Sequence, residues 1–387
     1  MKIISVVGAR PNFMKIAPFM QAIDDYNRGA AGSGSPIIHR LIHTGQHYDA
    51  SMSETFFQAL GIPEPDINLG IGSGSHAEQV GGTMIALEQE FLKEQPDWVV
   101  VLGDVNATLS ASVTAKKLLI RVCHIESGLR SRDMSMPEEI NRLVTDRLAD
   151  LLLTPDRISV ENLQQEGVPG DHIRFVGNIM IDTLENNRDK ARALSVGEII
   201  NTNMMDSQPE LVHIPHIGSY ALLTLHRPSN VDDESVLSGI IGLLIDDLSI
   251  KIPILWPIHP RSVNSLKKFG LWERVIQCPG LILLQPLGYH QMLRLNMDAR
   301  LMLTDSGGLQ EECTVLGTPC LTMRWNTERP ITLQEHGGAS VLVGNHIDRI
   351  REAFLATLQQ DRKPERPPLW DGKTAKRCLE AILRFTG

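Results

Sequence analysis

The sequence contains little of what would place it at once in a membrane, secreted or zinc-binding class. Only five of its 387 residues are cysteines, and none of them has C-x-x-C spacing. No apolar run reaches the length of a membrane-spanning helix, and the chain starts with a strand-like pattern rather than that of a signal peptide. We therefore expect a cytoplasmic protein with reduced thiols and no membrane partner.

Basic charge is also scarce. The chain has 37 Lys and Arg residues against 46 Asp and Glu, which gives a formal net charge of -9 at pH 7. Nucleic acids attract broad basic patches, so we expect no nucleic-acid partner. The 13 histidines include no H-E-x-x-H spacing and no tight cluster with acidic residues, so we also expect no bound metal.

Short β-branched runs alternate with helical patterns along the chain, which is typical of parallel sheets covered by helices on both faces. In the first half, the predicted strands are 3–7, 37–44, 98–102 and 122–125, and the predicted helices are 14–26, 52–60, 76–94, 108–119 and 137–148. A second series begins near Gly177, with predicted strands at 220–225, 252–257, 281–285, 300–303, 319–323 and 339–343. We expect an α/β protein of two doubly wound domains, because the chain exceeds what one core usually supports.

The segment L-T-D-S-G-G-L-Q-E-E, from Leu303 to Glu312, follows an apolar run and opens a predicted helix. Ser306, Gly307 and Gly308 would place unpaired backbone N–H groups and the positive end of a helix dipole where an anion can bind. Glycine allows that anion to approach closely. The segment predicts a phosphate site, and its alternative is an ordinary helix cap.

The turn after the first predicted strand lacks the G-x-G-x-x-G fingerprint, so we expect no nicotinamide cofactor. Pro11 can begin a helix, which leaves Arg10 and Lys15 near its positive end. Two cations gain nothing from the helix dipole there, which favours an anionic ligand over two solvated side chains.

Two carboxylates follow neighbouring predicted strands. Asp104 comes after 98–102 and Glu126 after 122–125, and the carboxyl ends of parallel strands meet at one edge of a sheet. Repulsion and desolvation there can raise one pKa into the range used for proton transfer. The structural alternatives are that Asp104 caps the next helix and that Glu126 pairs with Arg130.

Two further positions carry groups able to transfer protons or stabilise charge. Glu138 lies in the first turn of the helix that begins at Pro137, where an i, i+4 pair with Arg142 is the ordinary structural reading. His226 directly follows a predicted strand of the second domain, where an imidazole can titrate near neutrality.

These motifs, in this order and spacing, resemble those of the non-hydrolysing UDP-N-acetylglucosamine 2-epimerase family. The resemblance runs from Ile3 to about Gly344. The motifs that carry it are G-A-R-P-N-F-M-K-I-A-P (8–18), T-G-Q-H-Y-D (44–49), G-D-V-N-A-T (103–108), H-I-E-S-G-L-R (124–130), P-E-E-I-N-R (137–142), H-R-P-S-N-V-D (226–232), the Leu303 to Glu312 segment and N-T-E-R-P (326–330).

The resemblance implies the GT-B architecture, in which two Rossmann-like domains face each other across a cleft. The expected domains are 1–176 and 177–371, with a last helix in 372–387 that packs back on the first. The resemblance also implies a homodimer and a UDP-sugar substrate.

The family's chemistry, as the resemblance implies it, is elimination of UDP to give 2-acetamidoglucal, followed by re-addition with the opposite configuration at C2. Asp104, Glu126 and Glu138 are then the acid and base groups, and Lys15, His226 and Arg329 stabilise charge. The residues implied to bind the UDP-sugar are Arg10, Arg142, Ser306, Gly307, Gly308, Glu312, which would contact the ribose, and Arg329.

The sequence leaves several alternatives open. A hydrolysing epimerase would release free N-acetylmannosamine, and relatives that act on UDP-linked diacetamido-uronic acids share most of these motifs. A GT-B glycosyltransferase would not need three carboxylates in its first domain, and a catalytically silent UDP-sugar sensor could lose them. This chain keeps all three but carries Pro228, Ser229 and Ile331 where many relatives have charged residues.

Overall fold

The computed structural model describes residues 1–29, 35–45, 61, 64–206, 208–209 and 215–385, without the side chains of Arg10 and Pro11. It divides into two compact units, Met1–Asn186 with Pro368–Gly387, and Asn187–Pro367. The predicted helix at 52–60 and most of the T-G-Q-H-Y-D motif lie outside the described residues.

The first unit is built on a seven-stranded sheet in the order β3-β2-β1-β4-β5-β6-β7, with every pair of neighbours parallel. The strand order reverses between β1 and β4, so the ends of these two strands form the switch point where doubly wound sheets bind ligands. The strands are β1 Lys2–Val7, β2 Ile38–His43, β3 Ile67–Asn68, β4 Trp98–Leu102, β5 Arg121–Ile125, β6 Leu151–Thr154 and β7 Ile173–Phe175.

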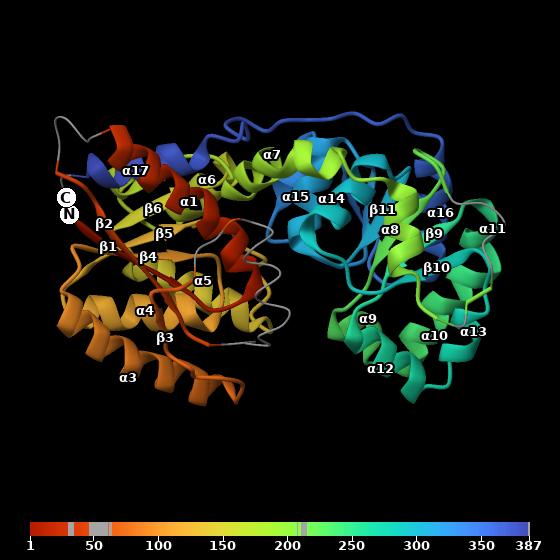
Figure 1. Cartoon of the computed structure of the whole chain (residues 1–387), viewed down its shortest axis with the longest axis horizontal. Helices are drawn as coiled ribbons and strands as arrows, with labels where there is room; N and C mark the ends of the chain where they lie inside the picture. Colours follow the sequence, from red (N-terminus) through yellow and green to blue (C-terminus); the bar gives the residue numbers. More distant parts are fainter. Residues whose placement is uncertain (30–34, 46–60, 62–63, 207, 210–214, 386–387) are drawn as a thin grey trace. The chain divides into compact units, whose positions relative to one another are not determined.

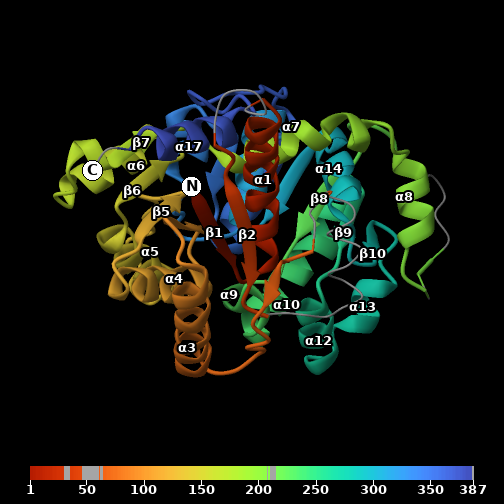
Figure 2. The same ribbon diagram turned by 60° about the vertical axis from the view of Figure 1, so that its left-hand side comes forward.

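Helices cover both faces of this sheet (Figure 1), and α1 runs beside β1 and β2 (Figure 2). On one face α1 packs against α17, and on the other α4 packs against α3 and α5. The helices are α1 Arg10–Gly29, α3 His76–Glu94, α4 Asn106–Lys117, α5 Pro137–Leu148, α6 Arg157–Gln165, α7 Ile179–Arg192 and α17 Thr374–Leu383.

The C-terminal segment belongs to the first unit through specific hydrogen bonds. The Asp182 carboxylate accepts hydrogen bonds from the backbone N–H groups of Thr374 (3.0 Å) and Ala375 (2.7 Å), which begin α17. The buried indole of Trp370 donates to the carbonyl oxygen of Pro155 at 2.9 Å. These bonds satisfy the free N–H groups of the helix start and fix α17 beside α1.

The second unit has a six-stranded parallel sheet in the order β10-β9-β8-β11-β12-β13. Its strands are β8 Ala221–Thr224, β9 Ile254–Pro257, β10 Leu281–Leu284, β11 Leu301–Thr304, β12 Cys320–Thr322 and β13 Ser340–Leu342. Its main helices are α8 Val196–Asn203, α9 Pro228–Val231, α10 Glu234–Leu243, α12 Pro260–Lys268, α13 Trp272–Ile276, α14 Tyr289–Asp298, α15 Gly307–Leu316 and α16 Ile347–Leu358.

Alternate residues of each strand face opposite layers of the second unit. Leu222 and Met302 pack with α8, α14 and α15, whereas Leu223 and Leu303 pack with α10, α12, α13 and α16. Strands buried on both faces read as continuous apolar runs, which is the pattern of the sequence here. The prediction of two doubly wound α/β units is confirmed. Within the described part of the chain, no helix combines the length and the apolar character needed to cross a membrane.

Candidate active site

A buried ion pair lies at the carboxyl end of the first sheet. The Lys15 ammonium, from α1, contacts Oε2 of Glu126, which directly follows β5, and the two side chains are 7% and 3% exposed. The alternative pairing of Glu126 with Arg130 is therefore wrong, because Arg130 binds Asp146 and Glu166 instead. Lys15 and Glu126, two predicted site residues, lie in direct contact.

The backbone around this pair is unusual. Glu126 has φ of 72° and Gly103, at the end of β4, has φ of 64°. A Cβ atom at Gly103 would lie 2.9 Å from Lys15 Nζ and 3.1 Å from Glu126 Oε2, so a side chain there would adopt a left-handed conformation and displace the ion pair. A left-handed conformation costs a non-glycine residue about 1 kcal/mol or more, and such strain concentrates at functional sites.

Asp104 is held from α5. Its carboxylate contacts the Arg142 guanidinium, and its carbonyl oxygen accepts a hydrogen bond from Asn141 Nδ2 at 2.8 Å. Val105, not Asp104, is the N-cap residue of α4, so the alternative that Asp104 caps this helix is wrong. The Asp104 side chain is 25% exposed and remains open to a ligand.

Arg142 is fully engaged by acidic groups. Besides Asp104, it binds the buried Glu139 carboxylate through Nε (2.9 Å) and Nη2 (2.6 Å). The predicted i, i+4 pair with Glu138 is therefore wrong, because the guanidinium is directed to Glu139 and Asp104. Glu138 is exposed in the first turn of α5 and has no ion-pair partner among the described residues.

Asn12, which was not among the predicted site residues, connects the turn after β1 to the end of β4. Its Nδ2 donates to the carbonyl oxygen of Leu102 at 2.9 Å, and its Oδ1 accepts from the N–H groups of Gly8 and Ala9. It therefore fixes the start of α1 at the switch point. The predicted ligand Arg10 begins α1, but its side chain lies outside the described structure.

In the second unit, an acidic residue orients the predicted histidine. Asp305 follows β11 and accepts hydrogen bonds from the N–H groups of His226 (2.9 Å) and Arg227 (2.8 Å), while its Oδ1 lies 2.8 Å from His226 Nδ1. Burial acts to raise the pKa of Asp305, but the hydrogen bonds from His226 and Arg227 hold that pKa below its usual value. His226 Nδ1 is thus tied to an anion, which leaves Nε2 for a ligand.

The predicted phosphate site has the expected helix start. Ser306 is the N-cap of α15, and its side chain makes no capping hydrogen bond. The first N–H groups of a helix have no partner within it, so those of Gly307 and Gly308 are available to an anion. A Cβ atom at Gly307 would lie 2.8 Å from Arg329 Nη1, so the guanidinium is placed beside the helix start.

Arg329 belongs to a charge-balanced cluster. It contacts Glu328 and donates from Nε to Glu311 at 2.8 Å, and Arg324 donates to Glu328 at 2.7 Å. Burial acts to raise the pKa of Glu328, but the two guanidinium groups hold that pKa far below its usual range. Within this structure, the Arg329 charge is compensated by carboxylates.

Glu312 is buried inside α15 and differs from the other carboxylates. Burial raises the pKa of Glu312 to about 7, although the neighbouring polar side chains of Tyr289 and Asn296 act to lower it. The carboxyl group is therefore divided between its protonated and ionised forms at neutral pH.

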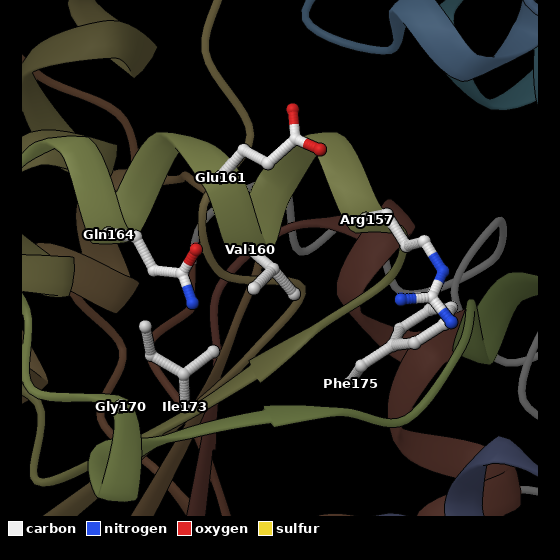
Figure 3. A pocket seen from close by; sticks show the side chains of 7 residues that line it. All are labelled: Arg157, Val160, Glu161, Gln164, Gly170, Ile173 and Phe175. Atoms are coloured by element: carbon white, nitrogen blue, oxygen red, sulfur yellow. The ribbon is translucent and has the colours of Figure 1, made fainter.

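A pocket away from these residues lies between α6 and β7 (Figure 3). The Arg157 guanidinium lies 5.5 Å from the centre of the Phe175 ring, and Val160 and Ile173 form the apolar wall. None of its lining residues is a predicted site residue. Across the described residues, no group of three His, Cys, Asp or Glu side chains is arranged to hold a metal ion.

Two Rossmann-like units with charged groups at the carboxyl ends of their strands define a protein of the GT-B type. A profile of the UDP-N-acetylglucosamine 2-epimerase family matches residues 33–383. The UDP-N-acetylglucosamine 2-epimerase of Methanocaldococcus jannaschii is 38% identical over 384 residues, which cover 99% of each chain. The chain therefore belongs to the UDP-N-acetylglucosamine 2-epimerase family, and the family resemblance and the prediction of an epimerase are confirmed.

Solved structures and a second relative agree with this assignment. The M. jannaschii enzyme in complex with UDP-GlcNAc and UDP has a TM-score of 0.86 at 37% identity, with 99% of each chain covered. The Neisseria meningitidis enzyme bound to UDP-GlcNAc has a TM-score of 0.83 at 27% identity, with 99% of this chain and all of that one covered. The UDP-2,3-diacetamido-2,3-dideoxy-D-glucuronate 2-epimerase of Pseudomonas aeruginosa is 34% identical over 391 residues, which cover both chains fully.

Proposed function

We propose that this protein interconverts UDP-N-acetylglucosamine and UDP-N-acetylmannosamine without releasing free sugar. The observation that carries the proposal is the full-length similarity to epimerases together with the presence of Asp104, Glu126 and Glu138 at the carboxyl end of one sheet. The similar M. jannaschii and N. meningitidis structures contain bound UDP-GlcNAc, which supports the same substrate here.

The C2 hydrogen of the sugar is not next to a carbonyl group, so simple deprotonation faces a high barrier, and we propose that the C2 proton is removed with loss of the C1 substituent. A base takes the C2 proton, the C–H electron pair forms a double bond between C1 and C2, and the C1–O bond breaks to release UDP. Re-addition returns UDP to C1 and a proton to the opposite face of C2. The route requires two proton-transfer groups and stabilisation of the leaving diphosphate.

The first unit supplies candidates for the proton transfers. Glu126 is fixed by its strained backbone and by Lys15, and Asp104 is fixed by Arg142 and Asn141. Glu138 is exposed and unpaired among the described residues, so it is free to approach a substrate. Positioned acids and bases of this kind contribute about 100-fold or more to a rate.

The second unit supplies the groups for UDP. The start of α15 would bind the diphosphate, Glu312 would accept hydrogen bonds from the ribose hydroxyls, and Nε2 of His226 would donate to the leaving group. The predicted groups are therefore divided between the two units. Arg10 and Arg329 remain predicted ligands of the diphosphate.

The products distinguish the alternatives. With UDP-GlcNAc as substrate, phosphorus and proton NMR should show a mixture of two UDP-sugars with no release of UDP or free N-acetylmannosamine. Free N-acetylmannosamine would identify a hydrolysing enzyme, and binding without any new signal would identify a sensor.

The full-length similarity to the P. aeruginosa enzyme favours one second candidate, a UDP-linked diacetamido-uronic acid. The same assay with that sugar as substrate decides between the two. If kcat/KM is at least tenfold higher for the UDP-linked uronic acid, that sugar is the preferred substrate in place of UDP-GlcNAc.

We further propose that the protein is a cytoplasmic homodimer that supplies activated N-acetylmannosamine for cell-surface polysaccharides. Ile85 and Leu92, seven residues apart on one face of α3, are 66% and 59% exposed. Exposed apolar residues grouped on one helix face are typical of a contact with a partner. Sedimentation of the wild type and of an Ile85→Glu, Leu92→Glu variant tests this, and a wild-type monomer would contradict it.

A further inference from the structure

His124, in β5, has hydrogen-bond acceptors on both sides of its fully buried ring. Its Nδ1 lies 2.6 Å from Oδ1 of Asp146, and its Nε2 lies 2.8 Å from the carbonyl oxygen of Gly103. Asp146 belongs to α5, and Gly103 directly follows β4. The ring therefore connects three elements behind the candidate site.

Neither acceptor is able to donate a proton. A carbonyl oxygen has none, and Asp146 is ionised. Burial acts to raise the pKa of Asp146, but His124 and Arg130 hold that pKa below its usual value. A neutral imidazole has a single N–H group, so it would satisfy one acceptor and turn a lone pair toward the other. Only the imidazolium, with two N–H groups, satisfies both.

A guanidinium group also binds Asp146. Arg130, in the loop after β5, donates to Oδ2 of Asp146 at 2.7 Å and to Glu166, an exposed residue at the end of α6, at 2.7 Å. His124 Nδ1 and Arg130 Nη1 thus contact different oxygens of Asp146, which stabilises its ionised form.

The ring acts on the two strand ends that carry the catalytic candidates. The Gly103 carbonyl that it holds belongs to the peptide bond before Asp104. Asp146 accepts a further hydrogen bond from the N–H of Gly128 at 3.0 Å, two residues after Glu126. The His124–Asp146 pair therefore ties the turn of Asp104 to the turn of Glu126.

Because the Gly103–Asp104 peptide bond is trans, the contact of the Gly103 carbonyl with His124 also fixes where the N–H of Asp104 points. The C=O of Gly103 points toward His124, so the N–H of Asp104 points the opposite way. That N–H donates to no acceptor among the described residues. A cation at the carbonyl end polarises the peptide and strengthens the N–H as a donor.

We propose that His124 is a positioning residue, held as the imidazolium, that fixes and polarises the Gly103–Asp104 peptide for a substrate oxygen. The protonation state follows from the contacts of this chain alone. Its effect on turnover rests on the proposed epimerase function.

The direct test is NMR of the ring nitrogens in protein labelled with 15N-histidine. The signals of His124 are assigned by their loss in His124→Gln, and His172→Gln, in the same unit, serves as the matched control. We expect both nitrogens of His124 to be protonated at pH 8, because both face acceptors. An unprotonated Nε2 at pH 8 would overturn the proposal, whether or not the protein is an epimerase.

Kinetics test the positioning role. With UDP-GlcNAc, His124→Gln should lower kcat by about 10- to 100-fold, the scale for the loss of an orienting partner, and change KM by less than about threefold. The Asp146→Asn variant should give a similar loss, while His172→Gln keeps wild-type kcat. Wild-type kcat in His124→Gln would overturn the positioning role, and the NMR of the wild type decides the protonation state if either variant fails to fold.

Discussion

The Lys15 ammonium and the Glu126 carboxylate form a buried ion pair between residues 111 positions apart in sequence. The pair lies against Gly103, where a side chain would displace it. Because removal of one partner leaves an uncompensated buried charge, the two residues should be coupled both in stability and in catalysis.

This coupling is measurable by a double-mutant cycle. Lys15→Met should lower the free energy of unfolding by about 3 kcal/mol, and Lys15→Met with Glu126→Gln should recover part of that loss. Urea unfolding of the four proteins measures the effect. Additive losses in the double variant would show that the two groups are not coupled in solution.

Glu138 and Glu139 should behave differently although they are adjacent. Glu138→Gln should lower kcat by about 100-fold or more with unchanged melting temperature, because its exposed carboxylate makes no ion pair within the described structure. Glu139 is buried and binds Arg142 as well as the N–H groups of Ser131 and Arg132, so Glu139→Gln should lower the melting temperature. Wild-type turnover in Glu138→Gln would remove that residue from the proposed acid and base groups.

The pKa of Asp305 predicts how stability depends on pH. A carboxyl group whose pKa is lowered by folding stabilises the folded state above its unfolded pKa of about 4, and that contribution is lost as the pH falls through the folded value. Asp305→Asn should therefore be less stable than the wild type at pH 7, with a smaller difference at pH 3. The exposed Asp171→Asn is the control, and a difference that does not depend on pH would contradict this account.

His226 depends on Asp305 for its orientation. His226→Ala should therefore lose most turnover while it still binds UDP, because the backbone groups at the start of α15 are unchanged. Calorimetry with UDP and the NMR product assay measure the two properties. Loss of UDP binding together with turnover would place His226 in ground-state binding instead.

The raised pKa of Glu312 predicts that the affinity for UDP-GlcNAc depends on pH. Its pKa of about 7 means that ionised carboxylate increases about tenfold between pH 6 and pH 8, and only that form accepts hydrogen bonds from both ribose hydroxyls. UDP-GlcNAc should therefore bind about tenfold more tightly at pH 8, as measured by calorimetry in the inactive Glu126→Gln background. The same dependence in a protein that also carries Glu312→Gln would assign it to another group.

The sequence predicted elements best where local signals are strong. The start of α5 follows from Pro137, and that of α3 follows from the capping box of Ser75 and Glu78. Strand β6, Leu151–Thr154, was not predicted, because only two residues separate it from the end of α5 and its leucines also favour a helix. The two-residue strand β3 is too short to have a pattern of its own.

The ion-pair partners of the site residues could not be predicted from local sequence signals. Sequence proximity favoured Arg130 for Glu126 and Glu138 for Arg142, whereas the structure pairs Glu126 with Lys15 and Arg142 with Asp104. These partners lie on different elements that only the folded sheet brings together. The contact of His226 with Asp305 was missed for the same reason, since β8 and β11 are neighbours in space but 79 residues separate the two side chains in sequence.

The central claim is that C2 of the sugar loses its proton and regains one on the opposite face. Incubation of the enzyme with UDP-GlcNAc in deuterated water, followed by proton NMR, tests this most directly. We expect deuterium at C2 in both the gluco and the manno UDP-sugars at equilibrium, with no deuterium in a Glu126→Gln control at the same time points. Formation of UDP-N-acetylmannosamine that keeps its original C2 hydrogen would contradict it.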